Sequence, residues 1–183
     1  IVAASRAPAL VAGLVLCAPV GGPRSVTALD RLLGRTPVGQ RILRVGLAVG
    51  GWLVARPGGA RLLPVAGLGR LDDGEARTAT RPARDPRARQ AAAVEQAALV
   101  DELAEVRRAA PQVCAPTVVL TGSDDVVVTP TAATALAAMI PGARVVRLEG
   151  GHLVPVEQPG AVADAVLALV RASAVRDHRP ESL

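Results

Sequence analysis

Four residue types are absent from this 183-residue chain, which has no Phe, Tyr, Lys or Asn, and it contains a single Trp. Val, Ala and Leu supply nearly all of its hydrophobic half, so the core must form from many small aliphatic contacts. The arginines are scattered and stacking aromatics are missing. The basic stripe and ring platforms of nucleic-acid readers are therefore lacking, and we expect no nucleic-acid partner.

The formal net charge of +5 comes with Arg as the basic residue throughout. Lys, Asn, Phe and Tyr all have AT-rich codons, so a GC-rich coding sequence accounts for the four absences together. The positive charge then reflects Arg in place of Lys and is weak evidence for an anionic partner.

Cysteine is scarce, with Cys17 at the end of one predicted strand and Cys114 just before another. In a parallel pair these positions lie at opposite ends of the sheet, about 13 Å or more apart. A disulfide needs Cα atoms within about 7 Å. We predict that both thiols are reduced, which suits a cytoplasmic protein.

Long hydrophobic runs are also missing. The most apolar window, residues 45–55, is about half of the ~20 residues that a membrane-spanning helix needs, and the first residues do not resemble a signal peptide. We expect no membrane partner. His, Cys and carboxylates form no cluster with ligand spacing, so we expect no metal site. Because the chain begins at Ile1, we expect it to be a piece of a longer protein.

Three short runs have the character of strands, at residues 11–17, 117–121 and 144–148. The first two are apolar or β-branched without alternation, which is typical of strands buried on both faces. Helical patterns fall at about 26–33, 39–54, 88–110, 131–140 and 160–172, whereas residues 67–86 are charged and rich in turn formers. Strands alternating with helices predict an α/β fold, a parallel sheet covered by helices on both faces.

The two strongest helices have clear apolar faces. In residues 88–110 the inward positions are predicted to be Val94, Ala98, Leu99, Leu103 and Val106, and in residues 160–172 they are Val162, Val166, Leu169 and Val170.

An acid and a histidine follow two of the predicted strands. Asp125 comes after strand 117–121 and His152 after strand 144–148. If these strands are neighbours, both side chains lie at the carboxyl edge of the sheet, where functional groups collect in open α/β folds. A carboxylate beside an imidazole fixes its tautomer and stabilises the imidazolium. Asp124 is the rival acid, but the offset from Gly122 favours Asp125.

The sequence from Cys114 to Asp125, then from Ile140 to His152, then Val156-Glu-Gln-Pro159, resembles the C-terminal end of the α/β-hydrolase fold. The shared features are a Pro-Thr strand entry, a glycine three residues before the acid, a Gly-His pair, and a Glu-x-Pro shortly afterwards. Residues 11–19 resemble the strand that follows the nucleophile's helix in that family.

The resemblance implies that Asp125 is the acid of a catalytic triad and His152 its general base. It also implies four segments: a core strand after the nucleophile helix (1–23), a helical cap insertion (24–110), C-terminal core strands and helices (111–175) and a tail (176–183). The nucleophile's Gly-x-Ser-x-Gly elbow does not occur in the chain, so no nucleophile is assigned, and we expect it just before Ile1. The isolated chain is then expected to be inactive.

The implied function is a serine-type hydrolase acting on a small ester, lactone or thioester, with no cofactor and a small-molecule substrate. Haloperoxidase, C–C hydrolase and dehalogenase chemistry stay open, as does a non-catalytic remnant. Epoxide hydrolases of the family that this chain resembles use tyrosines of the cap to activate the epoxide, and this chain has no Tyr, so epoxide hydrolysis is disfavoured. Four other polar or aromatic residues are predicted to have structural roles: Ser5 in a helix, Ser123 in a turn, Glu157 near the start of the final helix, and Trp52 in the cap core or a pocket wall.

Overall fold

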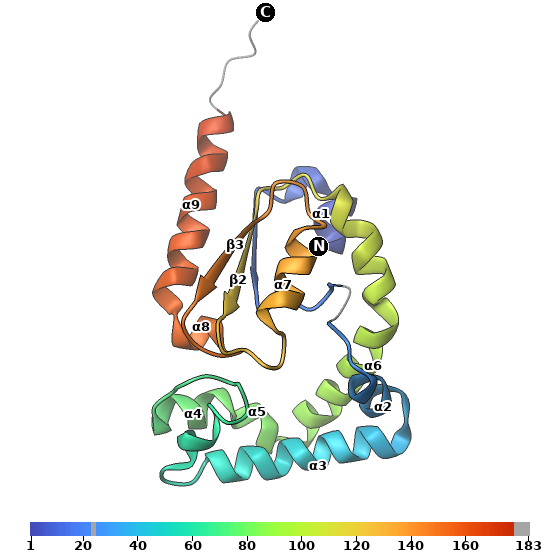
Figure 1. Ribbon diagram of the computed structural model, residues 1–183, viewed down its shortest axis with the longest axis vertical. Helices are drawn as coiled ribbons and strands as arrows, with labels where there is room; N and C mark the ends of the chain where they lie inside the picture. The colour runs from blue at the N-terminus through green and yellow to red at the C-terminus, as the bar shows by residue number, and fades with distance from the viewer. Residues whose placement is uncertain (23–24, 178–183) are drawn as a thin grey trace, which may run out of the picture.

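The computed structural model describes residues 1–22 and 25–177. Within these residues β1 (Leu14–Cys17), β2 (Thr117–Gly122) and β3 (Arg144–Leu148) form one parallel sheet in the order β1-β2-β3. Val15 lies opposite Val118, and Val119 lies opposite Val145. Helices flank the sheet (Figure 1), so the predicted α/β class with a parallel sheet is confirmed.

Burial differs sharply among the three strands. All six residues of the central strand β2 are buried. Val119 packs against Ala133 and Ala137 of α7 (Pro130–Ala137) on one face. Because successive side chains of a strand point to opposite faces, Val118 and Leu120 pack on the other face, against α8 (Val154–Glu157) and α9 (Pro159–Asp177).

The two outer strands are less covered. Strand β1 is only half buried and shorter than the predicted 11–17 run, and four of the five residues of β3 are exposed. The expectation of burial on both faces is therefore met by β2 and is wrong for β1, which lies at the edge of the described sheet and is only partly covered by the flanking helices.

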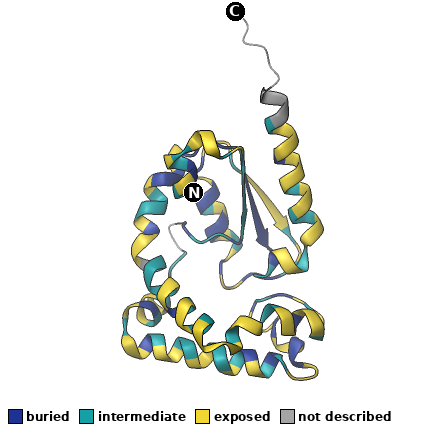
Figure 2. Ribbon diagram, turned by 180° about the vertical axis from the view of Figure 1, so that it is seen from behind, coloured by how far each residue is buried: buried dark blue, intermediate teal, exposed yellow. Residues whose placement is uncertain are grey.

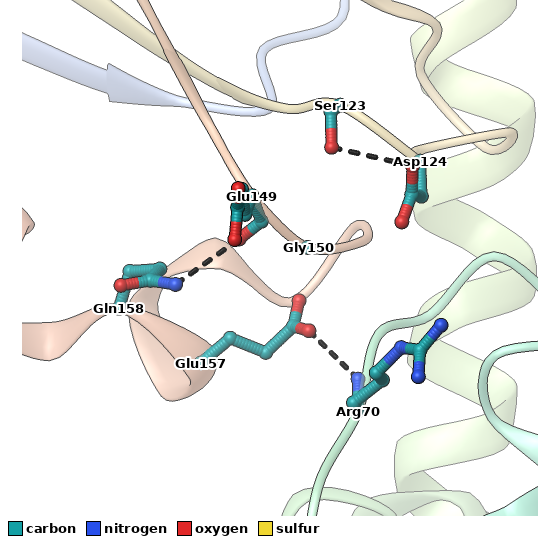
Figure 3. A pocket seen from close by; sticks show the side chains of 7 residues that line it. All are labelled: Arg70, Ser123, Asp124, Glu149, Gly150, Glu157 and Gln158. Atoms are coloured by element: carbon teal, nitrogen blue, oxygen red, sulfur yellow. Dashed lines mark hydrogen bonds between the residues drawn. The ribbon is translucent and has the colours of Figure 1, made fainter.

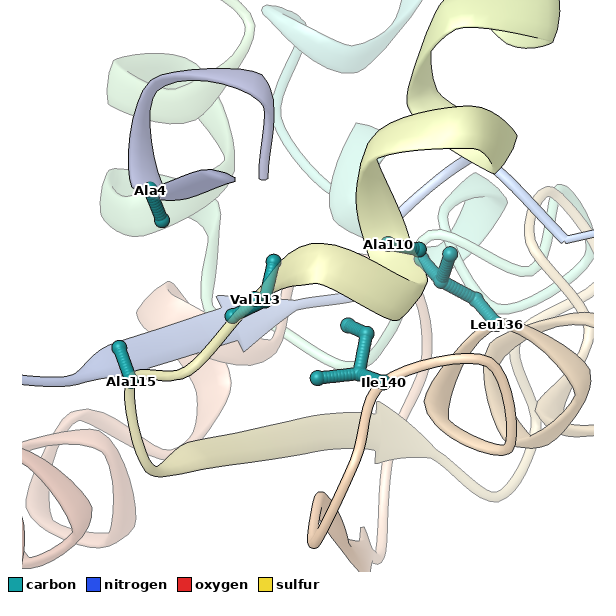
Figure 4. Close-up of a cluster of buried hydrophobic side chains, with 6 residues drawn as sticks. All are labelled: Ala4, Ala110, Val113, Ala115, Leu136 and Ile140. Carbon is teal, nitrogen blue, oxygen red and sulfur yellow. The ribbon is translucent and has the colours of Figure 1, made fainter. Parts of the chain in front are cut away.

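A further core cluster lies at the end of the sheet where β2 begins, between it and the first helix (Figure 4). It joins α1 (Val2–Arg6) to the 3-10 turn η3 (Ala110–Gln112) and to the end of α7. Its buried members are all aliphatic: Ala4, Ala110, Val113, Ala115, Leu136 and Ile140. A short 3-10 turn, η1 (Pro8–Leu10), leads from α1 toward β1. Small side chains in large number thus replace the missing aromatic rings.

Residues 25–109 form a helical insertion between β1 and β2. It comprises α2 (Ala28–Arg35), α3 (Pro37–Val54), η2 (Gly59–Leu62), α4 (Asp73–Ala79), α5 (Arg81–Arg84) and α6 (Pro86–Ala109). Figure 1 shows α3, α4 and α5 beyond the carboxyl ends of the strands, with α6 leading back toward the sheet. The insertion therefore faces the edge at which Asp125 and His152 are found.

Residues 67–86, which are charged and rich in turn formers, contain two short helices that the sequence did not indicate, α4 and α5. The N-terminus of α4 carries a capping box that composition did not reveal. Asp72 Oδ1 accepts hydrogen bonds from the amides of Gly74 and Glu75, while the Glu75 carboxylate accepts from the Asp72 amide. Such reciprocal caps satisfy amides that the first turn leaves without partners.

Two predicted helix faces are right only in part. On α6 Leu103 is buried and Val106 packs against a core cluster, as predicted, but Val94 is exposed and its neighbour Ala93 is buried instead, since close packing against α2 and α3 favours the smaller side chain. On α9 Leu169 is buried, but Val166 and Val170 are exposed, and Figure 2 shows much of this helix as exposed. Only a narrow stripe of α9 meets the sheet.

Several other expectations concern the ends of segments and the cysteines. Cys17 and Cys114 are both free, as predicted. The predicted boundary at residues 23 and 24 lies outside the described residues. Residues 176 and 177 of the predicted tail still belong to α9, and residues 178–183, with His178, lie outside the described part. Across residues 1–22 and 25–177, none of the helices has the length and apolar character needed to cross a bilayer.

Candidate active site

Asp125 lies in the loop that follows β2 and is almost completely buried, with 2% of its surface exposed. Its Oδ1 accepts hydrogen bonds from the main-chain amides of Val127 and Val128, both at 2.8 Å. These two bonds fix the plane of the carboxyl group, because the amides belong to a backbone turn that leads into α7. The second oxygen, Oδ2, remains free for another donor.

That donor is His152, in the loop after β3. Its Nδ1 lies 2.9 Å from Asp125 Oδ2, and its own main-chain amide donates to the Gly67 carbonyl at 2.9 Å. The two residues meet because β2 and β3 are neighbours and their carboxyl ends share one edge of the sheet. An ionised carboxylate can only accept, so Nδ1 carries the hydrogen. Nε2 makes no hydrogen bond to the described residues and is free to take a proton.

Glycines let the two loops approach each other. A Cβ atom on Gly122 would lie 2.1 Å from the Gly151 carbonyl oxygen, which no side chain tolerates. Gly150 has φ +131, a left-handed value that disfavours other residues. Residues 149–153, which carry His152, are called the histidine loop below. Gly122 must be glycine because its backbone contacts this loop closely, whereas Gly150 must be glycine because of its backbone conformation.

Asp124, the rival acid, points elsewhere. It is exposed, and its Oδ1 accepts a hydrogen bond from Ser123 Oγ at 3.2 Å. Both residues line a polar cavity of about 560 Å³ together with Arg70, Glu149, Gly150, Glu157 and Gln158 (Figure 3). Neither Asp125 nor His152 lines this cavity. The structure thus brings Asp125, and not Asp124, to the imidazole.

Trp52 does not lie in the cap core as one expectation had it. About half of its surface is exposed on α3, and the Arg56 guanidinium lies 3.6 Å above its ring. An apolar hollow lies nearby, and Trp52 is not one of its wall residues. The helical phase of α3 turns the indole toward solvent. Ser5, as expected, lies in a helix, where its Oγ donates to the Val2 carbonyl.

The apolar hollow itself has a volume of about 520 Å³ and is formed by the insertion. Its walls are largely aliphatic and come from α3, from residues 62–68 and from α5. Leu68 is one of these wall residues, and its carbonyl accepts the amide of Leu153, next to His152. The hollow therefore borders the segment that is hydrogen-bonded to the histidine loop.

Glu157 is the site residue whose role the sequence did not reveal. It ends α8 and lies two residues before α9 begins, so it is near the start of the final helix, as expected. Its carboxylate accepts the amides of Gly151 and Arg70. Arg70 is 87 positions away, so no local pattern could have indicated this contact.

The fold is that of the α/β-hydrolase class. A sequence profile described as the alpha/beta hydrolase family matches residues 1–165, and the chain belongs to this family. A comparison with curated proteins gave no match.

Solved structures agree on the fold. A thermophilic esterase from Thermogutta terrifontis is 27% identical, with a TM-score of 0.60 over 88% of this chain and 56% of that one. An enol-lactonase from Burkholderia xenovorans is 24% identical, with a TM-score of 0.57 over 93% of this chain and 60% of that one. An ancestral haloalkane dehalogenase is 17% identical, with a TM-score of 0.59 over 95% and 64% of the two chains. The chain thus spans less than two thirds of these relatives.

Proposed function

We propose that this chain supplies the acid and the base of a Ser-His-Asp hydrolase acting on a small ester, lactone or thioester. His152 takes the proton of a serine and later returns it to the leaving group, while Asp125 holds the imidazole and stabilises its charged form. The serine attacks the carbonyl carbon, and water then hydrolyses the acyl-enzyme. The serine and the oxyanion-hole amides belong to a segment preceding Ile1.

The observation that carries this proposal is the 2.9 Å contact between His152 Nδ1 and a buried Asp125 whose other oxygen is held by two amides. A carboxylate bound in this way is oriented for one task, which is to fix the imidazole with Nε2 outward. A solvated loop histidine would need no such buried partner.

An ester substrate is supported by the 27% identity to an esterase. The aliphatic walls of the 520 Å³ hollow, which include Leu43, Leu47 and Leu63, favour a substrate with a short aliphatic acyl group. These walls contain no aromatic residue, so there is nothing on which an aromatic acyl group could stack.

The proposal is tested first on the coding sequence and then on the full-length protein. We expect a strand followed by Gly-x-Ser-x-Gly within about 20 residues upstream of Ile1. The full-length protein should hydrolyse p-nitrophenyl acetate or butyrate, and His152→Ala should reduce kcat by about 10³-fold or more. His152→Ala should also lower the free energy of unfolding by about 1–3 kcal/mol, because it leaves the buried Oδ2 of Asp125 without its donor.

Other outcomes would separate the rival functions. An Asp at the elbow position would overturn the serine mechanism in favour of dehalogenase-type chemistry. An in-frame stop codon just upstream of the Ile1 codon, or an upstream segment without a nucleophile elbow, would identify the chain as a non-catalytic remnant. Haloperoxidase or C–C hydrolase activity in the absence of esterase activity would keep the triad but overturn the substrate class.

A further inference from the structure

Glu157 lies between the histidine loop and the helical insertion. One of its carboxylate oxygens binds the loop, and the other binds the insertion. Oε2 accepts the amide of Gly151 at 2.8 Å, and Oε1 accepts the amide of Arg70 at 2.7 Å. Figure 3 shows the side chain reaching from α8 toward Arg70. One carboxylate thus bridges two segments that are far apart in the sequence.

The same two segments are also joined directly. The His152 amide donates to the Gly67 carbonyl at 2.9 Å, and the Leu153 amide donates to the Leu68 carbonyl at 3.2 Å. Together with the two bonds to Glu157, this makes a strand-like clasp between residues 67–70 and residues 151–153. Hydrogen bonds to a charged acceptor are stronger than neutral ones, so Glu157 provides the strongest part of the clasp.

The surrounding backbone is shaped to admit this carboxylate. A Cβ on Gly69 would lie 2.1 Å from Glu157 Cδ, and a Cβ on Gly150 would lie 2.9 Å from its Oε1. Both glycines have positive φ values. Glu157 forms no ion pair with a described residue, so binding the two amides accounts for its place in the structure.

The histidine loop has a particular need for such an anchor. Two consecutive glycines, Gly150 and Gly151, precede His152, and glycine loses more conformational freedom on folding than any other residue. If the Gly151 amide is not held, the backbone that aims the imidazole can rotate. The Asp125–His152 bond fixes one end of the ring, and Glu157 adds the bond that holds the Gly151 amide to those that the His152 and Leu153 amides make with Gly67 and Leu68.

We propose that Glu157 is a positioning residue that seats the helical insertion against the histidine loop and thereby holds His152 at Asp125. The arrangement links the insertion to the acid–base pair, so displacement of residues 67–70 also loosens the imidazole. The effect of this link on turnover rests on the proposed function, whereas its effect on the His152 side chain does not.

The direct test is nuclear magnetic resonance of the His152 imidazole in the full-length protein. The His152 signals are assigned by their loss in His152→Gln. In the wild type we expect a slowly exchanging Nδ1 proton in a strong hydrogen bond to Asp125. Glu157→Ala should broaden or remove this signal and speed hydrogen exchange at the amides of Gly151 and Arg70.

Glu149→Gln is the matched control. Glu149 lines the same polar cavity and carries the same charge, but its carboxylate makes no hydrogen bond to a described residue. We expect the His152 signal of Glu149→Gln to match that of the wild type. Glu157→Gln, which keeps the size of the side chain but can accept through one oxygen only, should give an intermediate effect and serves if Glu157→Ala does not fold. An unchanged His152 signal and unchanged amide exchange in Glu157→Gln would overturn the proposal.

Activity of the full-length protein adds a second readout. We expect Glu157→Ala to lower kcat by about tenfold to a hundredfold with little change in KM, because a misplaced base slows chemistry more than binding. If neither Glu157→Ala nor His152→Ala lowers the activity, the proposed function fails. The nuclear magnetic resonance result then still decides the role of Glu157. If His152→Ala abolishes activity and Glu157→Ala does not lower kcat, the positioning role is overturned.

Discussion

Asp125 uses its two oxygens for different purposes, and substitutions can separate them. Oδ1 satisfies the amides of Val127 and Val128, whereas Oδ2 binds His152. Asp125→Asn keeps an oxygen for the amides but places an NH2 group against Nδ1, which forces the wrong imidazole tautomer. We therefore expect kcat to fall by about 10⁴-fold with a nearly unchanged unfolding temperature.

Asp125→Ala removes both functions. It leaves the two amides without an acceptor inside the protein, so we expect an additional loss of about 1–3 kcal/mol in the free energy of unfolding. Urea denaturation and ester hydrolysis of the full-length protein measure the two effects. Asp124→Asn, at the exposed neighbour, should change neither. A fall in activity with Asp124→Asn equal to that with Asp125→Asn would contradict the assignment of the acid.

At the scale of elements, Asp73 ties the start of α4 to the turn that follows α3. Its carboxylate accepts the amides of Gly58 at 2.7 Å and Ala60 at 3.3 Å. These hydrogen bonds hold the pKa of the Asp73 carboxyl below its usual value of 3.8, with smaller contributions from Arg77 and Arg61. The turn itself needs Gly58, which has φ +75.

The sign of the resulting pH dependence follows from the direction of the shift. Because the pKa is lower in the folded state than in the unfolded chain, the stabilisation is fully present above the unfolded value of 3.8 and is lost as the pH falls through the folded one. We expect the Gly58 amide resonance to titrate below pH 3.8 in the wild type and to stay constant in Asp73→Asn. The effect on global stability should be small, since the carboxyl is exposed to solvent. A Gly58 resonance that titrates equally in both proteins would refute the link.

At the scale of the whole molecule, a strand edge and an apolar stripe are left without a partner among the described residues. One is the free edge of β1, which pairs only with β2. The other is a stripe along α3 whose members recur every three or four positions and are all exposed: Val38, Ile42, Val45, Val49 and Trp52. The solved relatives are considerably longer than this chain. An uncovered strand edge and an apolar stripe favour association.

We therefore expect the 183-residue chain to self-associate in a concentration-dependent way when it is studied alone. Size-exclusion chromatography with light scattering should give a mass above that of the monomer, and Val49→Glu should reduce it. The substitution affects no core cluster, so the folded structure should persist. A monodisperse monomer that unfolds in one sharp transition would contradict this expectation.

Much of the framework followed from local sequence patterns. Strand and helix periodicity indicated the order of elements, because burial imposes a period on short apolar segments whatever lies around them. The placing of Asp125 and His152 just after two strands was enough to predict that they share one edge, since parallel strands end at the same side of a sheet. The helix faces were predicted in part: Leu103 is buried as expected, but Ala93 replaces Val94 because packing depends on the shape of the partner helix.

Tertiary structure alone decided the contacts that join distant segments. The clasp between Glu157, Gly151 and Arg70 depends on how the insertion folds back over the sheet, and no periodicity encodes a hydrogen bond between a side chain and an amide 87 positions away. The outward turn of Trp52 and the pairing of Asp73 with Gly58 have the same origin. Sequence by itself thus determined which residues could perform acid–base chemistry, and the packing of the insertion determined which residues hold them in place.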